Sequence, residues 1–188
     1  MKTLTIECSS GRGSIAVTEG DRHFFSLDFE NPRGRGVEFF AALEEAVCRC
    51  DDFARVLVGT GPGSYNGLRA SIAAAWGLAK ARRAEWKGIP SVFGYDAPEY
   101  FVIGDARAGQ WFFAHIRHGA LAHPIDLLPP DQATARLAEG VPVFSTSPLL
   151  DSACYEAPQA RFLARHTSQF GPAEPIYLKP PHITKSAA

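Results

Sequence analysis

The sequence has almost no net charge, no long apolar run and few cysteines. Among its 188 residues, 19 Lys and Arg face 20 Asp and Glu, whereas a protein dedicated to nucleic acid binding normally has a basic excess. No apolar run approaches the roughly 18 residues of a membrane span, and Glu7 follows the first apolar residues too soon for a signal peptide. Cys48 and Cys50 have neither zinc-knuckle nor thioredoxin spacing. We therefore expect a cytoplasmic protein whose cysteines are free thiols.

Several catalytic and ligand-binding signatures are missing as well. A P-loop requires Lys after its last glycine, and no Lys follows Gly63 or Gly67. A dinucleotide-binding turn requires a third glycine where Ser64 stands, and the residues around Ser64 do not match the nucleophile elbow GxSxG. His115 and His118 lie in a predicted strand, where their spacing puts the side chains on opposite faces. We expect a structural or surface role for this pair, and no metal site.

The composition is that of a globular protein. Apolar residues make up 46% of the chain and charged residues 21%, so a packed core can form. A chain of 188 residues fits one large domain or two small lobes. We divide it into an N-terminal lobe over residues 1–98 and a shortened C-terminal lobe over residues 99–188.

The first half has a clear secondary-structure pattern. Alternating β-forming residues predict an antiparallel meander at the start, and helical spacing then alternates with short apolar runs. The predicted strands are Thr3–Cys8, Gly13–Thr18, His23–Phe29, Ala54–Gly59 and Gly88–Phe93, and the predicted helices are Val37–Arg49 and Asn66–Arg83. The order βββαβαβ indicates an α/β fold and permits a parallel crossover.

The second half has a weaker pattern. Its strand candidates are Tyr100–Ala106, Trp111–Arg117, Leu121–Leu128 and Val141–Phe144, and its helix candidate is Asp131–Glu139. From Pro148 onward, several prolines favour extended or irregular chain. We expect this half to be too short for a full lobe of its own, with its closing helices missing.

The most informative segment is Gly59–Arg69, which reads GTGPGSYNGLR. It joins a predicted strand to a predicted helix, where glycine permits close backbone approach and a helix N-terminus presents outward-pointing N–H groups. A tight connection without a ligand is the alternative. We expect Ser64 to cap the helix by accepting a backbone N–H. The candidate loop residues are Gly61, Pro62, Gly63, Ser64 and Gly67.

A helical wheel over Asn66–Arg83 separates two faces. The face expected to meet the core contains Leu68, Ile72, Ala75, Trp76 and Ala79, and the other contains Ala70, Ala73, Ala74, Gly77 and Ala81. This second face has only small residues and no charge, so we expect it to pack against another helix. That helix is either Val37–Arg49 of the same chain or a helix of another subunit. Glycine inside a helix costs about 1 kcal/mol relative to Ala, and close helix contact is one reason to keep Gly77.

The glycine-rich run resembles the signature of a known family. Residues Gly61–Arg69, GPGSYNGLR, are similar to the GPGSFTGLR segment of the bacterial TsaB (YeaZ) proteins, with Tyr and Asn in place of Phe and Thr. Met1–Val17 resembles the opening strand pair of that family, Gly104–Phe112 its IDARxGEVY segment, and Pro175–Lys179 its terminal P-x-YLR. The resemblance spans most of the chain, and the first segment is the most specific.

The resemblance implies the ASKHA fold, shared with actin-like and sugar-kinase ATPases, and a subunit that is not itself the catalyst. TsaB proteins pair with the related subunit TsaD, which transfers a threonylcarbamoyl group to the adenosine beside the anticodon of certain tRNAs, and the ATPase TsaE works with the pair. The resemblance further implies a homodimer in isolation, tRNA contact only through the complex, no required cofactor, and room for a nucleotide at the partner interface. TsaB proteins dimerise and bind TsaD through their first two helices, so the partner-binding candidates here are Arg69, Ala70, Ala73, Ala74, Gly77 and Ala81.

Some residues depart from the family pattern or leave alternatives open. Glu7 and Cys8 stand where TsaB proteins have Asp-Thr, and ASKHA ATPases use an Asp there with Mg²⁺, so the case for ATP hydrolysis is weak. Asp105 and Arg107 form either an ion pair or a capped turn. Arg69 lies early in its helix, where a positive charge interacts unfavourably with the helix dipole. This position suggests a carboxylate or phosphate partner. The alternatives to a scaffold subunit are a stand-alone ASKHA-type ATP-dependent enzyme and, from the family's former grouping with glycoproteases (M22), a peptidase.

Overall fold

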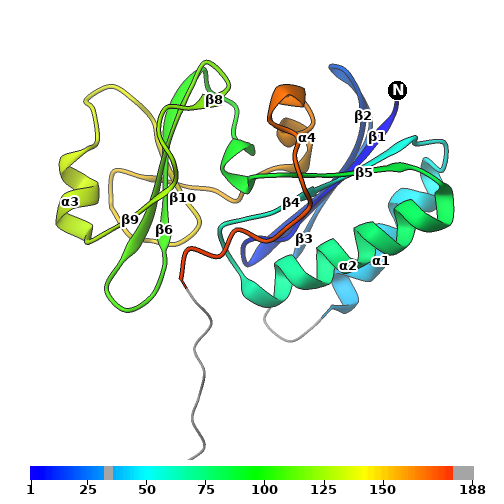
Figure 1. The fold of residues 1–188 in the computed structure, drawn as a ribbon, viewed down its shortest axis with the longest axis horizontal. Helices are drawn as coiled ribbons and strands as arrows, with labels where there is room; N and C mark the ends of the chain where they lie inside the picture. Colours follow the sequence, from blue (N-terminus) through cyan, green and yellow to red (C-terminus); the bar gives the residue numbers. More distant parts are fainter. Residues whose placement is uncertain (32–35, 180–188) are drawn as a thin grey trace, which may run out of the picture.

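The computed structural model of this protein describes residues 1–31 and 36–179. It contains two β-sheets, and two long helices lie side by side along one face of the first sheet (Figure 1). The first sheet and its helices come from β1 (Thr3–Glu7), β2 (Arg12–Glu19), β3 (Arg22–Glu30), α1 (Val37–Arg49), β4 (Arg55–Gly59), α2 (Tyr65–Arg82) and β5 (Glu85–Ile89). The order βββαβαβ is the one predicted from the sequence.

The strand order of the first sheet is β3-β2-β1-β4-β5. Strands β1, β2 and β3 pair antiparallel, whereas β4 pairs parallel with both β1 and β5. All five residues of β1 are buried, because α1 and α2 contact one face of the sheet and α4 (Ala160–Leu163) contacts the other. Strand β1 nevertheless alternates between polar and apolar residues, and its polar residues Thr3, Thr5 and Glu7 are buried along with Leu4 and Ile6. The edge strand β3 is more exposed and keeps the alternation.

The second sheet has the order β11-β10-β6-β7-β8, with β9 also paired to β7. The antiparallel pair β6–β7 forms its centre. The two α-helices that this half of the chain contributes are short, with six residues in α3 and four in α4. The elements of this half are η1 (Ser91–Phe93), β6 (Glu99–Asp105), β7 (Trp111–Arg117), β8 (Ala120–Leu121), β9 (Asp126–Leu128), α3 (Pro130–Ala135), β10 (Val143–Ser145), β11 (Cys154–Tyr155), α4 and η2 (Thr167–Gln169).

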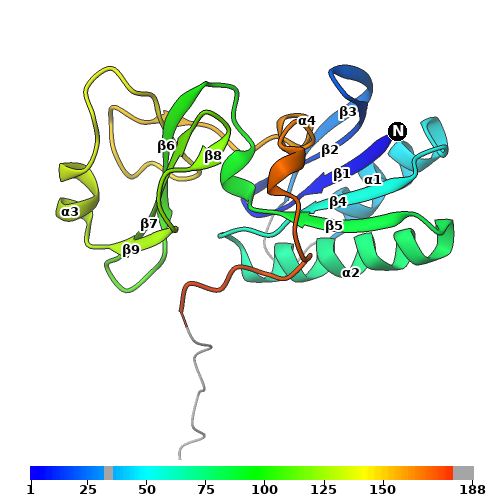
Figure 2. The same ribbon diagram turned by 45° about the horizontal axis from the view of Figure 1, so that its top comes forward.

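The last described segment returns to the first sheet and then crosses to the second (Figure 2). Gly171 forms a β-bridge with Gly88, and the backbone N–H of Ile176 donates to the carbonyl of Thr60 at 2.8 Å. The Lys179 ammonium then donates to the carbonyls of Ala106 and Arg107, beyond β6. This segment therefore ties the glycine-rich loop to the second sheet.

Several predicted elements are wrong in extent. The strand predicted at Gly88–Phe93 lies earlier, at Glu85–Ile89, because Pro90 ends it and a 3₁₀ turn follows. The predicted strand Leu121–Leu128 is two short strands, and the predicted helix Asp131–Glu139 starts one residue earlier and ends at Ala135. Strand β11 and helix α4 were not predicted, since each is too short to show periodicity.

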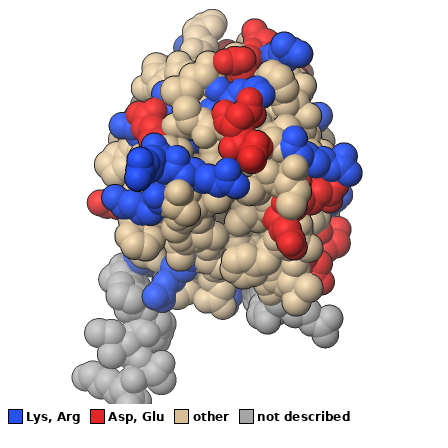
Figure 3. All heavy atoms as spheres, turned by 90° about the vertical axis from the view of Figure 1, so that its right-hand side faces the viewer, with Lys and Arg blue, Asp and Glu red and all other residues tan. Residues whose placement is uncertain are grey.

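The described residues contain no helix that combines the length and the apolar character needed to cross a membrane. All four cysteines are free thiols, and only Cys8 is buried. Basic and acidic side chains alternate on the face drawn in Figure 3, without a broad area of one sign. This distribution agrees with the net charge of −1.

Candidate functional site

The glycine-rich loop between β4 and α2 packs directly against the turn that joins β1 to β2. A Cβ atom at Gly63 would lie 2.1 Å from the carbonyl oxygen of Ser9, and one at Gly67 would lie 2.2 Å from that of Cys8. A Cβ at Gly59 would lie 1.8 Å from a carboxylate oxygen of Glu7. Gly63 and Gly67 require glycine because the backbone of one turn touches the other, and the lack of a side chain at Gly59 leaves room for the Glu7 carboxylate.

The N–H groups of the loop are used inside the protein. Thr60 N–H donates to the carbonyl of Ile89 at 2.8 Å, and Ser64 N–H donates to the carbonyl of Ser9 at 2.6 Å. Gly61 N–H donates to the Ser91 hydroxyl at 2.9 Å. The expectation of outward-pointing N–H groups is therefore wrong at these positions, because the adjoining turn and strand supply the acceptors.

Ser64 is the N-cap of α2, as predicted. Its hydroxyl accepts the backbone N–H of Gly67 at 3.3 Å, and its backbone carbonyl accepts that of Leu68 at 2.9 Å. A hydroxyl engaged with a helix N-terminus stabilises the helix start.

Glu7 is a fully buried carboxyl at the end of β1, beside the loop. One carboxylate oxygen accepts the backbone N–H of Ser9 at 2.5 Å, and the other accepts the hydroxyl of Ser91 at 2.6 Å. Ser91 in turn exchanges hydrogen bonds with Gly61 through its hydroxyl and its backbone N–H. Burial raises the pKa of Glu7, and the bonds from Ser9 and Ser91 partly offset this effect. The carboxyl thus links the β1–β2 turn to the glycine-rich loop.

The titration of Glu7 should make the free energy of unfolding depend on pH. Because its pKa is raised in the folded state, its favourable contribution is complete below the pKa of the unfolded chain. That contribution is lost as pH rises through the folded pKa. Urea unfolding at pH 5 and pH 8 should therefore show the wild type losing stability relative to Glu7→Gln as pH increases. A constant difference between the two proteins would contradict the assignment.

The small-residue face of α2 is largely exposed. Ala70, Ala73, Gly77 and Ala81 are exposed, whereas Ala74 is half-buried and packs on the core. Apart from its chain neighbours and the backbone of its own helix, no described atom would lie within 4 Å of a Cβ added at Gly77. The alternative that helix α1 covers this face is therefore wrong for the exposed positions.

Trp76 was expected to face the core, and its position is different. The residue is 50% exposed, while Leu68, Ala75 and Ala79 are buried as predicted. Trp76 lines a shallow hollow of about 530 Å³ on the flank of α2. The hollow is formed by Tyr65, Arg69, Ile72, Ala73, Trp76, Trp86, Pro175 and Tyr177.

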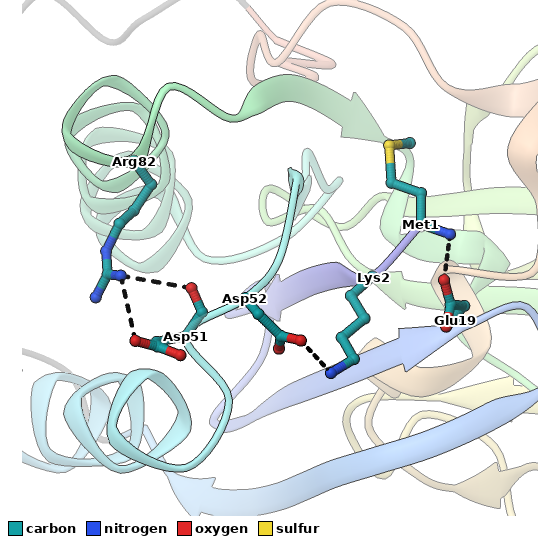
Figure 4. Close-up of polar contacts among 6 residues, drawn as sticks. All are labelled: Met1, Lys2, Glu19, Asp51, Asp52 and Arg82. Carbon is teal, nitrogen blue, oxygen red and sulfur yellow. Dashed lines mark hydrogen bonds and ion pairs between the residues drawn. The ribbon is translucent and has the colours of Figure 1, made fainter.

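Helix α2 carries Arg69, Lys80 and Arg82 and no acidic residue. Arg69 donates to the Tyr65 hydroxyl at 2.7 Å and forms no ion pair with any described residue. Arg82 lies near Asp51, which is just past the end of α1 (Figure 4). One guanidinium nitrogen of Arg82 is 3.8 Å from the carboxylate of Asp51 and donates to the backbone carbonyl of Asp51 at 3.4 Å. The Arg82 contacts tie the ends of the two helices together.

The other titratable candidates have structural roles. Arg107 N–H donates to the carboxylate of Asp105 at 2.7 Å, so this pair forms a capped turn, as one alternative predicted. His115 Nε2 lies 2.9 Å from Glu99 Oε1 on the neighbouring strand. The prediction that His118 lies in the same strand as His115 is wrong, because β7 ends at Arg117 and His118 follows in a turn with φ of 50°. In the part of the chain that the structure describes, no three His, Cys, Asp or Glu side chains are grouped to hold a metal ion.

Two solved structures from Pseudomonas aeruginosa are similar to this chain along nearly its whole length. A protein described as similar to the peptidase YeaZ has a TM-score of 0.75 at 18% identity, covering 95% of this chain and 99% of that one. YeaZ itself has a TM-score of 0.71 at 19% identity, covering 94% and 99%. This chain has the YeaZ fold. No known family profile and no curated protein sequence matches it.

The likeness to YeaZ confirms the predicted α/β fold, including the predicted order of its first half. Near-complete coverage of both chains shows that the two sheets are arranged as in YeaZ. The glycine-rich loop, Glu7 and the exposed face of α2 are therefore parts of a YeaZ-like framework, and their contacts are those of this chain.

Proposed function

We propose that this chain is a non-catalytic TsaB-type subunit that binds TsaD and supports threonylcarbamoyl transfer to tRNA. The observation that carries the proposal is the exposed small-residue face of α2, which lets another helix approach closely and has no cover in the described part of the chain. A contact of this kind serves binding, and the partner supplies the catalytic groups. The GPGSYNGLR segment and the YeaZ fold support the choice of partner.

The state of Glu7 also supports a role without catalysis. Its carboxylate is buried, and both of its oxygens accept hydrogen bonds from the protein. A carboxylate used in this way acts as a structural acceptor. No arrangement among the described residues favours the ATP-dependent enzyme or the peptidase over the scaffold.

The remaining parts of the proposal follow from the family resemblance. The chain would work in the cytoplasm, form a homodimer when isolated, and act with TsaE as well as TsaD. Contact with tRNA would come through the complex, and the partner interface is where a nucleotide would bind.

Replacing Gly77 by leucine should weaken association with TsaD by roughly tenfold or more, because the added side chain holds the two helices apart. The variant should stay folded, since a Cβ at this position meets no described atom. Titration calorimetry with TsaD of the same organism would measure the affinity, and circular dichroism would check the fold.

The matched control is Gly11→Leu, at an exposed turn where a Cβ also has open space. This control should bind TsaD like the wild type. If wild-type protein shows neither binding to TsaD nor an effect on its transfer activity, the proposed function is wrong.

A further inference from the structure

The hollow beside α2 has an unusual lining for exposed surface. Tyr65, Trp76 and Tyr177 are 50–51% exposed and Trp86 is 36% exposed. The rings of Tyr65 and Tyr177 lie 5.4 Å apart, so part of each ring already packs against the other. Half-exposed aromatic side chains around a hollow are typical of surfaces that bind another protein.

One residue that lines the hollow is a cation, Arg69, and a second cation, Lys80, lies one turn of α2 beyond Trp76, outside the lining. Arg69, Trp76 and Lys80 recur at intervals of seven and four residues, so they share one stripe of α2 with Trp76 in the middle. Neither Arg69 nor Lys80 forms an ion pair with a described residue, whereas Arg82 is close to Asp51. The stripe therefore offers an apolar centre between two positive charges.

This charge pattern bears on which chain occupies the hollow. If α2 of a second copy lay along the stripe, a parallel arrangement would place Arg69 against Arg69, and an antiparallel one would place Arg69 against Lys80. Like charges facing each other disfavour such a contact. A segment that carries carboxylates and a large apolar side chain complements the stripe.

We propose that the hollow binds an acidic segment of the heterologous partner subunit. An apolar side chain of that segment packs against Trp76 and Trp86, and its carboxylates lie beside Arg69 and Lys80. The contact adjoins the small-residue face of α2, because Ala73 belongs to both surfaces. The inference rests on the proposed function, since the partner is the TsaD subunit proposed above, and it assigns a second part of the chain to the interface.

The test is calorimetric titration of the full chain with that partner at about 50 and about 300 mM NaCl. Truncating a buried aromatic anchor commonly weakens binding about 30-fold or more, so we expect this loss for Trp76→Ala. The double variant R69Q/K80Q should bind several-fold more weakly at low salt and should lose most of the salt dependence of the wild type. The control Arg161→Gln, on the opposite face of the first sheet, should bind unchanged.

The outcomes separate this inference from the proposed function. If the wild type binds but Trp76→Ala and R69Q/K80Q bind equally well, the hollow is not part of the interface and the inference is overturned, while the function stands. If Trp76→Ala changes only the mass of the isolated chain in light scattering, the occupant is a second copy and the inference is again overturned. If the wild type does not bind the partner, the proposed function fails. Circular dichroism checks each variant, and R69Q/K80Q keeps the test valid should Trp76→Ala misfold.

Discussion

Replacing Gly63 by alanine should destabilise the folded chain by roughly 3 kcal/mol. The new Cβ would lie 2.1 Å from the backbone oxygen of Ser9, a distance that real Cβ atoms do not show. Relief by backbone movement would also break the bond from Ser64 N–H to the same oxygen. The free-energy costs of the steric overlap and of the lost hydrogen bond therefore add. Urea unfolding followed by circular dichroism would measure the change.

The chain offers a matched control in Gly77→Ala. Gly77 lies in a helix interior with open space around it, so alanine there should raise stability by up to about 1 kcal/mol. The same substitution is thus expected to act in opposite directions at the two glycines. A Gly63→Ala variant as stable as the wild type would show that the loop and the β1–β2 turn are not in backbone contact.

The fold of the first half was predictable because its elements are long enough to show their period. Helix α1 begins and ends where the sequence predicted, and α2 is displaced by one residue at each end. The second half has strands of two and three residues, such as β8 and β10, and β10 pairs with β6, which lies about 40 residues earlier in the chain. Local pattern carries little information about elements of this kind.

The error at Trp76 has a physical cause. The helical wheel grouped this residue with Leu68, Ala75 and Ala79, which are buried. Helix periodicity places Trp76 at the border of the buried face, where an aromatic ring can turn either way. The hollow forms because Trp86, in the next strand, and Tyr177, remote in sequence, lie beside this border.

The glycine-rich loop shows a second limit of sequence reasoning. Glycine is needed both where a ligand approaches the backbone and where another loop does. The sequence correctly excluded two phosphate-binding patterns. It contained no signal that the backbone carbonyls of Ser9 and Cys8 would contact the glycine-rich loop. The role of Glu7 was equally hidden, because its partner Ser91 lies 84 residues away.

Glu7→Ala should cost roughly 3 kcal/mol, the second large effect expected in this chain. The substitution removes the acceptor for Ser9 N–H and for the Ser91 hydroxyl, both in buried surroundings. It also leaves a cavity at the end of β1. The substitution also removes the cost of burying an ionisable carboxyl, since burial disfavours its ionised form, and this gain offsets part of the lost stability.

A series of variants resolves these contributions. Ser91→Ala deprives Gly61 N–H of its acceptor but keeps the Glu7 bond to Ser9, so its loss should be intermediate, about 1–2 kcal/mol. Glu7→Gln retains an acceptor for Ser9 and the volume of the side chain, so its loss should be the smallest. Urea unfolding at one pH would rank the three. Equal stability of Glu7→Ala and Glu7→Gln would mean that this carboxyl does not hold the loop, because only the alanine removes the acceptor and opens the cavity.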